Sequence, residues 1–414
     1  MLEDLKERGF FQQSTHPEEL AKRLKEDPIC CYVGFDPTAD SLHVGHLIPL
    51  MGLAHMQRRG HQIIALMGGG TAMIGDPSGK TEMRKMLTEK QLQANIEGML
   101  PQLERFLDFS GDGILVNNSE WLRDLNYIDF LRDIGKHFSV NRMLSFETYK
   151  VRLESGLSFL EFNYQLLQAY DFLELNRRYD CTLQMGGDDQ WANIISGTDL
   201  ERRVERKDAF GWTYPLLTTS SGKKMGKTEK GALWLDPKRT SAYEYYQYWV
   251  NTEDTDVEKF LALFTFLPMD EVRELGRLQG ADIREAKQRL AFETTALIHG
   301  KESALQAQQA AQALFSGNSG VLNSDKSNVP STKIAATKFT AGLGIFDIFQ
   351  QTGLCKSKSE ARRLQAQGGV YVNDLRIDNP DYCLGETDLQ DGEILLRAGK
   401  KRYHRLILET KEEK

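Results

Sequence analysis

The sequence predicts an α/β protein whose N-terminal half is built on a parallel β-sheet. Residues 29–35 and 61–67 each read as a short buried strand, and a helical pattern lies between them. A strand–helix–strand succession of this length implies that the two strands are parallel. The chain of 414 residues is also too long for one hydrophobic core, so more than one domain is expected.

The first strand–helix–strand unit predicts where a ligand binds. Its first strand ends in the turn-rich stretch 36–41, and its second strand ends at three glycines, 68–70. The helix between them is expected to begin near Gly45 and to stop at Gly60, because Pro49 is tolerated in a first turn but not deeper. Ligands of parallel sheets bind at the carboxyl ends of the strands, where both turns lie.

The remaining elements follow in order along the chain. Residues 92–176 are mainly helical in pattern, with one strand expected at 113–116 and another at 183–185. Residues 241–315 are helical again. The stretch 316–333 is small and polar, with glycines and a proline, which is typical of a linker. A small unit of one helix and several short strands follows it.

The charge of the chain is unevenly distributed. The formal net charge of -7 does not predict a nucleic-acid binder, because such proteins carry a basic patch or stripe. From residue 350 to the end, however, 12 Lys and Arg stand against 11 Asp and Glu, which leaves 40 against 48 in the rest. Any surface that faces RNA is therefore local, and this tail is the first place to look.

The cysteines and the apolar runs predict a cytoplasmic protein. The five cysteines form no C-x-x-C pair, so neither a zinc site nor a disulfide framework is indicated. Residues 1–11 are charged and lack the apolar centre of a signal peptide. No uninterrupted apolar run approaches the roughly 20 residues that span a bilayer.

The most specific motif is His43-Val44-Gly45-His46, which lies between the first strand and the helix. The two imidazoles are three residues apart and share a face, and Gly45 lets a ligand approach the backbone. A helix N-terminus also favours an anion. Two alternatives remain at this point: a pair of metal ligands, although no third ligand with zinc spacing is near, or two surface histidines.

A second motif is the lysine-rich stretch 223–228, Lys-Lys-Met-Gly-Lys-Thr. A lysine loop without an acidic partner suits phosphates whose charge grows during a reaction, although a charge run is also typical of a solvated surface. A P-loop is excluded here and at residues 75–81, because Ser221 and Ile74 stand where its first glycine is required.

Together, the two motifs resemble the paired signatures of class I aminoacyl-tRNA synthetases, H-x-G-H after the first strand and K-M-x-K-[ST] after the sheet. The blocks between them are similar to those of the bacterial tyrosyl-tRNA synthetases, and the similarity runs over nearly the whole chain. These blocks are Tyr32 to His43, Gly75 to Lys80, Tyr164 to Asp171 and Gly186 to Trp191.

The resemblance implies four parts. A Rossmann-like catalytic domain with a helical insertion would occupy residues 1–228, and a helical anticodon-binding domain residues 229–315. A linker at 316–339 would lead to an α+β RNA-binding domain at 340–414, of the type first seen in a ribosomal small-subunit protein. The implied activity is ligation of L-tyrosine to its transfer RNA through a tyrosyl-adenylate made from ATP.

The resemblance also assigns the tyrosine pocket. Tyr164, Gln168 and Asp171 fall at i, i+4 and i+7 on one stripe of a helix. Asp171 and Tyr32 would bind the substrate phenol, and a substrate without the hydroxyl would leave a buried carboxylate unpaired, at a large cost. The full implied set is Tyr32, Asp76, Tyr164, Gln168, Asp171 and Gln190.

On the nucleotide side, the resemblance implies positioning and electrostatic stabilisation rather than a nucleophile, because the substrate carboxylate itself attacks the α-phosphate. Mg²⁺ would accompany ATP through phosphate oxygens, and no protein-caged metal is expected. The implied ATP-binding residues are Asp36, His43, His46, Gly187, Asp189 and Lys227. The implied catalytic residues are Thr38, His43, His46, Lys80, Arg84, Lys224 and Lys227.

The RNA partner is expected at the C-terminal unit, where basic groups near an aromatic ring can pair with phosphates and stack on bases. By itself this pattern is also that of a solvated surface. The resemblance implies that the unit grips the long variable arm of tRNA(Tyr) and that the protein is a homodimer. The candidate RNA-binding residues are Lys358, Arg362, Arg363, Lys400 and Lys401.

Four positions depart from the family's commonest residues, and they put nucleotide affinity in doubt rather than the reaction. They are Val33, Pro49, Asp188 and Ala192. Two other hypotheses are open: an RNA-binding or splicing factor without the activity, and another adenylate-forming nucleotidyltransferase. The full set of site residues disfavours the first, and the RNA-binding tail disfavours the second.

Overall fold

The computed structural model describes residues 2–78, 86–220, 222, 225–228, 231–315, 329–335, 342–399 and 402–409, with the backbone alone for 227–228, 313–315 and 409. The chain forms two compact units. One contains residues 1–240 and 248–301, and the other contains residues 241–247 and 302–414. The prediction of an α/β protein with a small α+β part at its C-terminus is confirmed.

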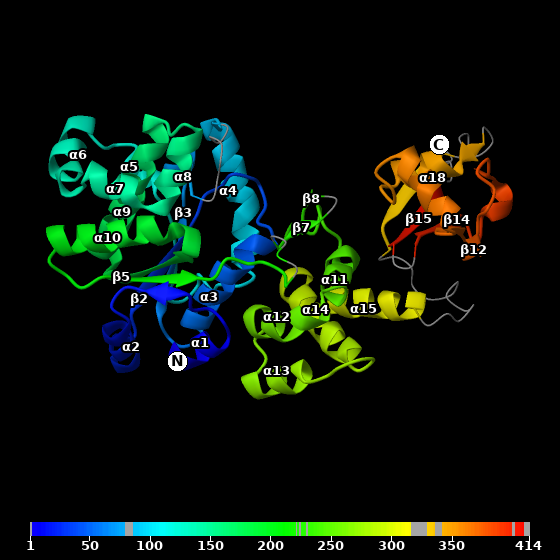
Figure 1. Ribbon diagram of the computed structural model, residues 1–414, viewed down its shortest axis with the longest axis horizontal. Coiled ribbons are helices and arrows are strands. Elements are labelled where there is room, and N and C mark those ends of the chain that lie inside the picture. The colour runs from blue at the N-terminus through cyan, green and yellow to red at the C-terminus, as the bar shows by residue number, and fades with distance from the viewer. Residues whose placement is uncertain are drawn as a thin grey trace. The chain divides into compact units, whose positions relative to one another are not determined.

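The first unit is built on a six-stranded sheet with the order β1-β6-β5-β2-β3-β4 (Figure 1). Neighbouring strands are parallel except β1, which pairs with β6 in the antiparallel sense. The central strands are buried on both faces, which explains why they read as continuous apolar runs. The strands are β1 (Gln13–Ser14), β2 (Cys30–Phe35), β3 (Gln62–Met67), β4 (Gly113–Asn117), β5 (Cys181–Gly187) and β6 (Phe210–Tyr214).

Helices cover both faces of this sheet. Tyr32 of β2 packs with Phe172 of α9 on one face. On the other face, a Cβ atom at Gly52 of α3 would lie 2.2 Å from the Tyr214 hydroxyl. The helices of this part are α1 (Leu2–Glu7), α2 (Pro17–Glu26), α3 (Leu47–Gln57), α4 (Glu89–Leu103), α5 (Ser119–Leu122), α6 (Tyr127–Asp133), α7 (Val140–Ser145), α8 (Glu147–Ser155), α9 (Phe159–Tyr179) and α10 (Trp191–Val204).

The start of α3 differs slightly from the prediction. Residues Val44–His46 form a 3-10 turn, and the α-helix begins at Leu47. The reason is local capping: the His43 ring accepts a hydrogen bond from the Gly45 amide, which fixes the turn before the helix. Pro49 is then the third helical residue, where a missing amide costs no intrahelical hydrogen bond.

The first unit also contains a short hairpin and three further helices. The hairpin strands are β7 (Lys227–Thr228) and β8 (Gly231–Ala232), and the helices are α12 (Val257–Phe264), α13 (Met269–Gly276) and α14 (Ile283–His299). Helix α11 (Ala242–Val250) belongs in part to the second unit, which includes residues 241–247, and α15 (Lys301–Phe315) belongs to it from residue 302. Among the described helices, none has the length and apolarity needed to cross a bilayer.

The C-terminal part of the second unit is a five-stranded sheet with the order β12-β11-β14-β15-β9, packed with two helices around one apolar core. A separate two-stranded pair is formed by β10 and β13. The elements are β9 (Ser331–Ala335), β10 (Leu343–Gly344), α17 (Ile345–Gln351), α18 (Lys358–Ala366), β11 (Val370–Val372), β12 (Leu375–Arg376), β13 (Cys383–Leu384), β14 (Glu393–Ala398) and β15 (Arg402–Glu409).

Strand β9 lies inside the range predicted as a linker, 316–339. It pairs in the parallel sense with β15, about 70 residues later in the chain, so the folded unit begins before residue 340. The sequence Ser-Thr-Lys-Ile-Ala has little apolar alternation, and its place in the sheet depends on a distant partner. Local patterning therefore could not separate this strand from the linker.

Candidate active site

A cavity of about 300 Å³ opens at the carboxyl ends of the central parallel strands in the first unit. This is where the two turns of the first strand–helix–strand unit led us to expect a ligand. Ten of the predicted site residues line it: Tyr32, Asp36, Thr38, His46, Asp76, Tyr164, Gln168, Asp171, Asp189 and Gln190.

One of the most buried polar groups of the cavity is the Asp171 carboxyl of α9, which is 2% exposed. Its oxygens accept hydrogen bonds from Asn118 Nδ2 at 2.9 Å and Trp121 Nε1 at 2.8 Å. Burial raises the pKa of Asp171 to about 8, although the two donors oppose this shift. The side chain is therefore held in one position by two fixed donors and faces the cavity.

Tyr32 of β2 lies in the same cavity, and its ring is 1% exposed. Its hydroxyl is buried and has no hydrogen-bond partner among the described residues. Burial, and then the charge of Asp171, raise the pKa of Tyr32 well above its usual range. Tyr32 therefore offers a neutral hydroxyl beside a carboxyl group, and this pair can bind a ligand hydroxyl as both donor and acceptor.

Further carboxylates surround the middle of the cavity. Asp36 accepts hydrogen bonds from the Tyr164 hydroxyl at 2.9 Å and from the Thr71 hydroxyl at 2.8 Å. Burial, and then the charges of Asp36 and Asp76, raise the pKa of Tyr164 well above its usual range. With Asp76, Asp171 and Asp189, the cavity holds four acidic side chains, an arrangement that favours a cationic group on the ligand.

One amide network orients the other polar side chains of the cavity. Gln190 Nε2 donates to Asp76 at 2.8 Å. Asn193 Nδ2 donates to the side-chain oxygens of Gln168 at 3.0 Å and Gln190 at 3.1 Å. Ser78 donates its backbone amide to Asp76 at 2.9 Å. Fixed partners of this kind reduce the reorganisation that a bound ligand requires.

The two histidines of the H-x-G-H motif lie side by side, with ring centroids 4.1 Å apart. His46 lines the cavity, whereas His43 is not among its lining residues. His43 Nδ1 accepts a hydrogen bond from the Gly45 amide at 3.0 Å, and His46 Nδ1 accepts one from the His43 amide at 3.1 Å. A neutral ring whose Nδ1 accepts must carry its proton on Nε2. Each ring can therefore donate from Nε2 to an oxygen of a ligand.

The two sequence motifs meet in space. The Val44 amide donates to the Leu233 carbonyl, and the Leu233 amide donates to the Gly226 carbonyl. Gly226 has a φ of +79°, and a Cβ atom there would lie 3.4 Å from the Gly45 amide nitrogen. A glycine at this position lets the lysine motif pack against the histidine motif.

Gly187 and Asp189 lie at the end of β5. A Cβ atom at Gly187 would lie 2.6 Å from an Asp189 carboxylate oxygen, so the glycine leaves room for that side chain. The neighbouring Asp188 instead accepts hydrogen bonds from Gln13 at 2.7 Å and Thr213 at 2.9 Å. This unusual aspartate therefore ties β1 to the sheet and does not face the cavity.

Several predicted residues cannot be placed. Lys80, Arg84 and Lys224 lie outside the described residues, as do Lys400 and Lys401 of the C-terminal unit. For Lys227 the backbone lies in β7 and nothing is described of the side chain. The candidate RNA-binding residues that can be placed are Lys358, Arg362 and Arg363, all on α18.

Two of these α18 residues have partners in the C-terminal unit. Lys358 pairs with Asp347, and the Arg362 guanidinium lies 5.6 Å from the centroid of the Phe346 ring. On the sheet, the Arg397 guanidinium lies 3.7 Å from the centroid of the Tyr371 ring. The unit thus carries stacked and paired basic groups of the kind that RNA-binding surfaces use.

The sequence reasoning missed Asn118 and Trp121, the two donors that hold Asp171. A signal for them existed, because both follow the predicted strand 113–116 and therefore lie at a carboxyl end. Thr71 and Asn193 were missed as well. Neither stands in a motif, and each contacts a site residue that is 25 or more positions away in the chain.

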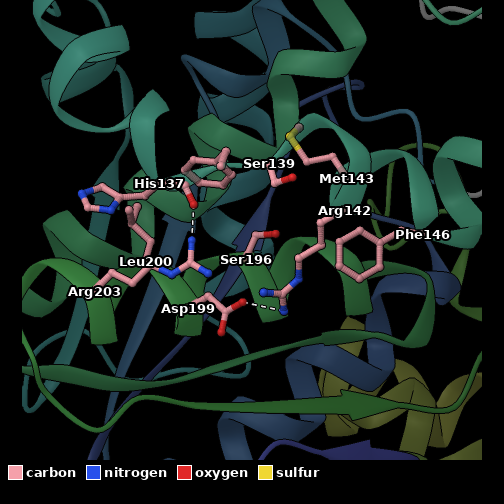
Figure 2. Close-up of a pocket in the computed structure, with 10 residues that line it drawn as sticks. His137, Ser139, Arg142, Met143, Phe146, Ser196, Asp199, Leu200 and Arg203 are labelled. Carbon is pink, nitrogen blue, oxygen red and sulfur yellow. Dashed lines mark hydrogen bonds and ion pairs between the residues drawn. The ribbon is translucent and has the colours of Figure 1, made fainter.

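A smaller hollow of about 40 Å³ lies between residues 137–146 and α10 (Figure 2). Arg142 pairs with Asp199 there at 2.6 Å, and Arg203 donates to the His137 carbonyl. None of the predicted site residues lines it. Across the part of the chain that the structure describes, no group of three or more potential metal ligands occurs. The larger cavity is therefore the candidate active site.

Comparisons with known proteins point to one family. A family model described as tRNA synthetases class I (W and Y) matches residues 24–316, and one described as Tyrosine--tRNA ligase SYY-like C-terminal domain matches residues 322–406. The chain is 59% identical over 409 residues to the tyrosine–tRNA ligase of Caldanaerobacter subterraneus subsp. tengcongensis, with 99% of each chain covered. It is 56% identical over 407 residues to that of Clostridium beijerinckii, with 98% of each covered.

A solved structure extends the similarity to three dimensions. A C-terminally truncated mitochondrial tyrosyl-tRNA synthetase from Aspergillus nidulans matches with a TM-score of 0.68 and 33% identity. The match covers 76% of this chain and 93% of that one.

Proposed function

The chain belongs to the tyrosine–tRNA ligases of the class I tRNA synthetase family, and on this basis we propose that it activates L-tyrosine with ATP and transfers it to tRNA(Tyr). The first step forms tyrosyl-adenylate and pyrophosphate. The second step moves the tyrosyl group to the 3′-terminal adenosine of the RNA.

The observation that carries this proposal is the pair of Tyr32 and Asp171 at the bottom of the cavity. The Asp171 carboxyl accepts a hydrogen bond from the hydroxyl of the substrate phenol, and the Tyr32 hydroxyl donates one to the phenol oxygen. Asn118 and Trp121 hold Asp171 in place for this contact. A phenylalanine side chain offers neither group, so its binding leaves buried polar atoms unpaired at a cost of about 1–3 kcal/mol each.

The rest of the amino acid lies along the acidic part of the cavity. Asp76, Tyr164 and Gln168 bind the ammonium group, and Gln190 orients the carboxylate that attacks ATP. The hydrogen bond between Gln190 and Asp76 supports this arrangement, because it holds the side chain proposed to bind the ammonium group beside the one proposed to orient the carboxylate. Asp36 lies on the adenylate side and accepts a hydrogen bond from the Tyr164 hydroxyl.

The nucleotide lies at the mouth of the site. Thr38 and His43 bind the γ-phosphate, His46 binds the ribose end of ATP, and Asp189 binds ribose hydroxyls beside Gly187. His43 and His46 suit oxygen ligands because each ring can donate its Nε2 proton in a hydrogen bond. The basic residues that close over pyrophosphate are Lys80, Arg84, Lys224 and Lys227. Catalysis then comes from positioning and from stabilising charge on the leaving group, without a protein nucleophile.

Mg²⁺ fits this site as a companion of ATP rather than as a caged ion. The donor set near the phosphates consists of imidazoles, a hydroxyl and basic groups, which suits phosphate oxygens and not a hard cation. When bound, the ion neutralises charge on the phosphates. The five cysteines are all free thiols, which supports a working place in the reducing cytoplasm.

Two parts of the chain bind the RNA. Helices in the range 229–315 bind the anticodon side of tRNA(Tyr), and the C-terminal unit binds its long variable arm. Lys358, Arg362 and Arg363 on one helix, with Lys400 and Lys401 later in the chain, supply phosphate contacts. Phosphate contacts of this kind make affinity fall steeply with salt.

We infer that the active form is a homodimer. Of the exposed large apolar side chains that the structure describes, seven of thirteen fall within residues 127–159. Large exposed apolar patches mark interaction sites, so this segment is the candidate contact between two copies of the chain. The seven side chains are Tyr127, Ile128, Leu131, Val140, Val151, Leu153 and Phe159.

The reaction is tested by exchange of labelled pyrophosphate into ATP. We expect tyrosine to support exchange, and phenylalanine and tryptophan to fail.

Tyr32→Phe removes one hydrogen-bonding group from the pocket and should raise the KM for tyrosine by about 5- to 30-fold, the equivalent of about 1–2 kcal/mol. Tyr214→Phe is the matched control, because Tyr214 is equally buried on the other face of the sheet. Exchange driven by tryptophan instead of tyrosine would overturn the substrate assignment.

A further inference from the structure

Residues 2–10 contact four elements of the first unit, namely β6, the end of α3, the end of α12, and α13. At their centre is Arg8, which follows α1 and is only 6% exposed. Its guanidinium donates to the carbonyls of Ala262 at 3.3 Å, Thr265 at 3.4 Å and Leu267 at 2.7 Å. These carbonyls lie at the end of α12 and in the loop that leads to α13. A buried cation here satisfies carbonyls that a helix end leaves without partners.

The neighbours of Arg8 extend these contacts. Asp4 pairs with Arg8 at 3.3 Å and also with Arg59, just after α3. Glu7 pairs with Arg273 of α13. We call residues 2–10 the N-terminal clasp, because they connect α3 to the loop between α12 and α13.

The clasp is also anchored to the sheet. The Phe10 carbonyl accepts a hydrogen bond from Trp212 Nε1 of β6 at 2.7 Å, and the Phe10 ring is fully buried. Its centroid lies 6.1 Å from that of Tyr214 in the same strand. Phe10 therefore anchors the clasp to β6, and Arg8 extends from this anchored segment to the end of α12 and the loop that follows it.

The C-terminal end of helix α3 also contacts the loop between α12 and α13. The Arg58 guanidinium lies 3.5 Å from the centroid of the Phe266 ring, and the His55 ring lies 5.0 Å from it. Burial, and then the charges of Arg8 and Arg58, lower the pKa of His55 to about 3. The His55 ring is therefore neutral near pH 7 and packs as an aromatic group. Its contact with Phe266 does not depend on protonation of the ring.

The opposite end of α3 is part of the active site. His46 immediately precedes this helix of 11 residues, which is about 16 Å long at about 1.5 Å per residue. One rigid element therefore has the H-x-G-H motif at its N-terminus and the loop 265–267 at its C-terminus. Figure 1 draws α1 and α3 close together, and the ion pair between Asp4 and Arg59 places α1 beside the C-terminal end of α3.

We propose that the N-terminal clasp is a positioning device for the transfer step, and that Arg8 is the positioning residue at its centre. It holds α12 and α13 at a fixed place relative to α3 and the sheet, so that RNA bound by these helices presents its 3′ end to an adenylate of the dimer. This inference rests on the proposed function, in which helices of the range 229–315 bind tRNA(Tyr). Tyrosine activation involves no RNA and does not need the clasp.

Measuring tyrosine activation and tyrosine transfer separately distinguishes a positioning role from a purely structural one. The test variant is Arg8→Met, which keeps a long side chain but removes the donors to the three carbonyls. Lys6→Met is the matched control, because Lys6 is on the same helix, is 37% exposed and pairs only with Glu3 among the described acidic groups. Both variants remove one positive charge. Each is measured by tyrosine-dependent pyrophosphate exchange and by aminoacylation of tRNA(Tyr), at a temperature where circular dichroism shows that it is folded.

We expect Arg8→Met to lower kcat/KM for tRNA(Tyr) by about tenfold or more and to change exchange by less than about twofold, because a displaced substrate costs rate only in the step that uses it. Lys6→Met should change neither. An equal fall in both steps, or no fall in aminoacylation, would overturn the proposal.

If Arg8→Met does not fold, the double variant Asp4→Asn/Glu7→Gln releases the clasp from α3 and α13 and must show the same separation of the two steps. The wild-type protein tests the proposed function independently. If tyrosine supports no exchange in the unaltered chain, the proposed function fails, whereas the clasp is judged only by the ratio of each variant to wild type.

Discussion

Two buried carboxyl groups in the first unit, Asp171 and Glu201, have a pKa raised to about 8. Their surroundings differ. Asp171 accepts two hydrogen bonds and faces the cavity. Glu201 of α10 is fully buried, and neither of its carboxyl oxygens has a hydrogen-bond partner among the described residues. The first arrangement serves a ligand, whereas the second is a cost to stability whenever the group is ionised.

Glu201 therefore makes the stability of the fold depend on pH. Burial, and then the charge of Glu205, raise its pKa from 4.5 to about 8 in the folded protein. Between these two values the unfolded chain releases a proton that the folded protein retains, so stability falls as pH rises from about 4.5 to about 8. Below this window the group is neutral in both states and has no effect.

We expect Glu201→Gln to be more stable than wild type by about 1–4 kcal/mol at pH 8, and the difference to disappear near pH 4.5. Urea unfolding followed by circular dichroism at both pH values measures it. Glu26→Gln, an exposed position on α2, is the control and should show no such dependence. A difference that is constant with pH would contradict the assignment of the titrating group.

At the scale of the element, α9 places three site residues on one face. Its N-terminus is fixed by a capping box, in which Ser158 and Glu161 each accept a hydrogen bond from the other's backbone amide. Glu161 also forms an ion pair with Arg152 of α8 at 2.9 Å, with both side chains 2% exposed. Tyr164 follows one turn later, so this buried pair sets where the tyrosine-binding face begins.

We expect Arg152→Met to lower the free energy of unfolding by about 3–5 kcal/mol, because it leaves the Glu161 carboxylate buried without its cation. Lys150→Met is the matched control on the same helix, since Lys150 is 58% exposed and pairs with Glu147 at 3.8 Å, and exposed pairs contribute about 0–1 kcal/mol. Denaturant titration measures both. Equal effects of the two substitutions would show that burial of the Arg152 pair does not matter.

The elements that the sequence predicted are those whose signal is local. The strands at 29–35, 61–67, 113–116 and 183–185 were found because each is a short apolar run between turns, and all four are in the sheet. Strand β6, with the sequence Phe-Gly-Trp-Thr-Tyr, was missed, since its glycine and polar residue interrupt the run. The stripe of Tyr164, Gln168 and Asp171 needed only helical spacing.

The parts of the site that sequence did not predict depend on contacts between distant positions. Asn118 and Trp121 reach Asp171 across 53 and 50 positions of chain. Their hydrogen bonds depend on how β4 and α9 pack on the same sheet. Local spacing contains no information about such a contact, although the rule that sites lie at carboxyl ends of strands narrows the search.

At the scale of the whole molecule, the proposed homodimer is expected to bury the exposed apolar side chains of residues 127–159. Ile128 is 67% exposed and Leu153 is 50% exposed. Burying them against a second copy would release about 25 cal/mol for each Å² of apolar surface removed from water. Aspartate at either position would place a charge in the contact, which costs several kcal/mol unless the charge is paired.

We expect the wild-type chain to sediment at twice its mass of 47.1 kDa, and Ile128→Asp/Leu153→Asp to sediment as a monomer at the same concentration. Leu375→Asp is the matched control, because Leu375 is 72% exposed but lies in the second unit, outside the predicted contact. It should remain dimeric. A wild-type chain that sediments as a monomer at micromolar concentration would contradict the dimer, and dissociation by Leu375→Asp alone would move the contact to the C-terminal unit.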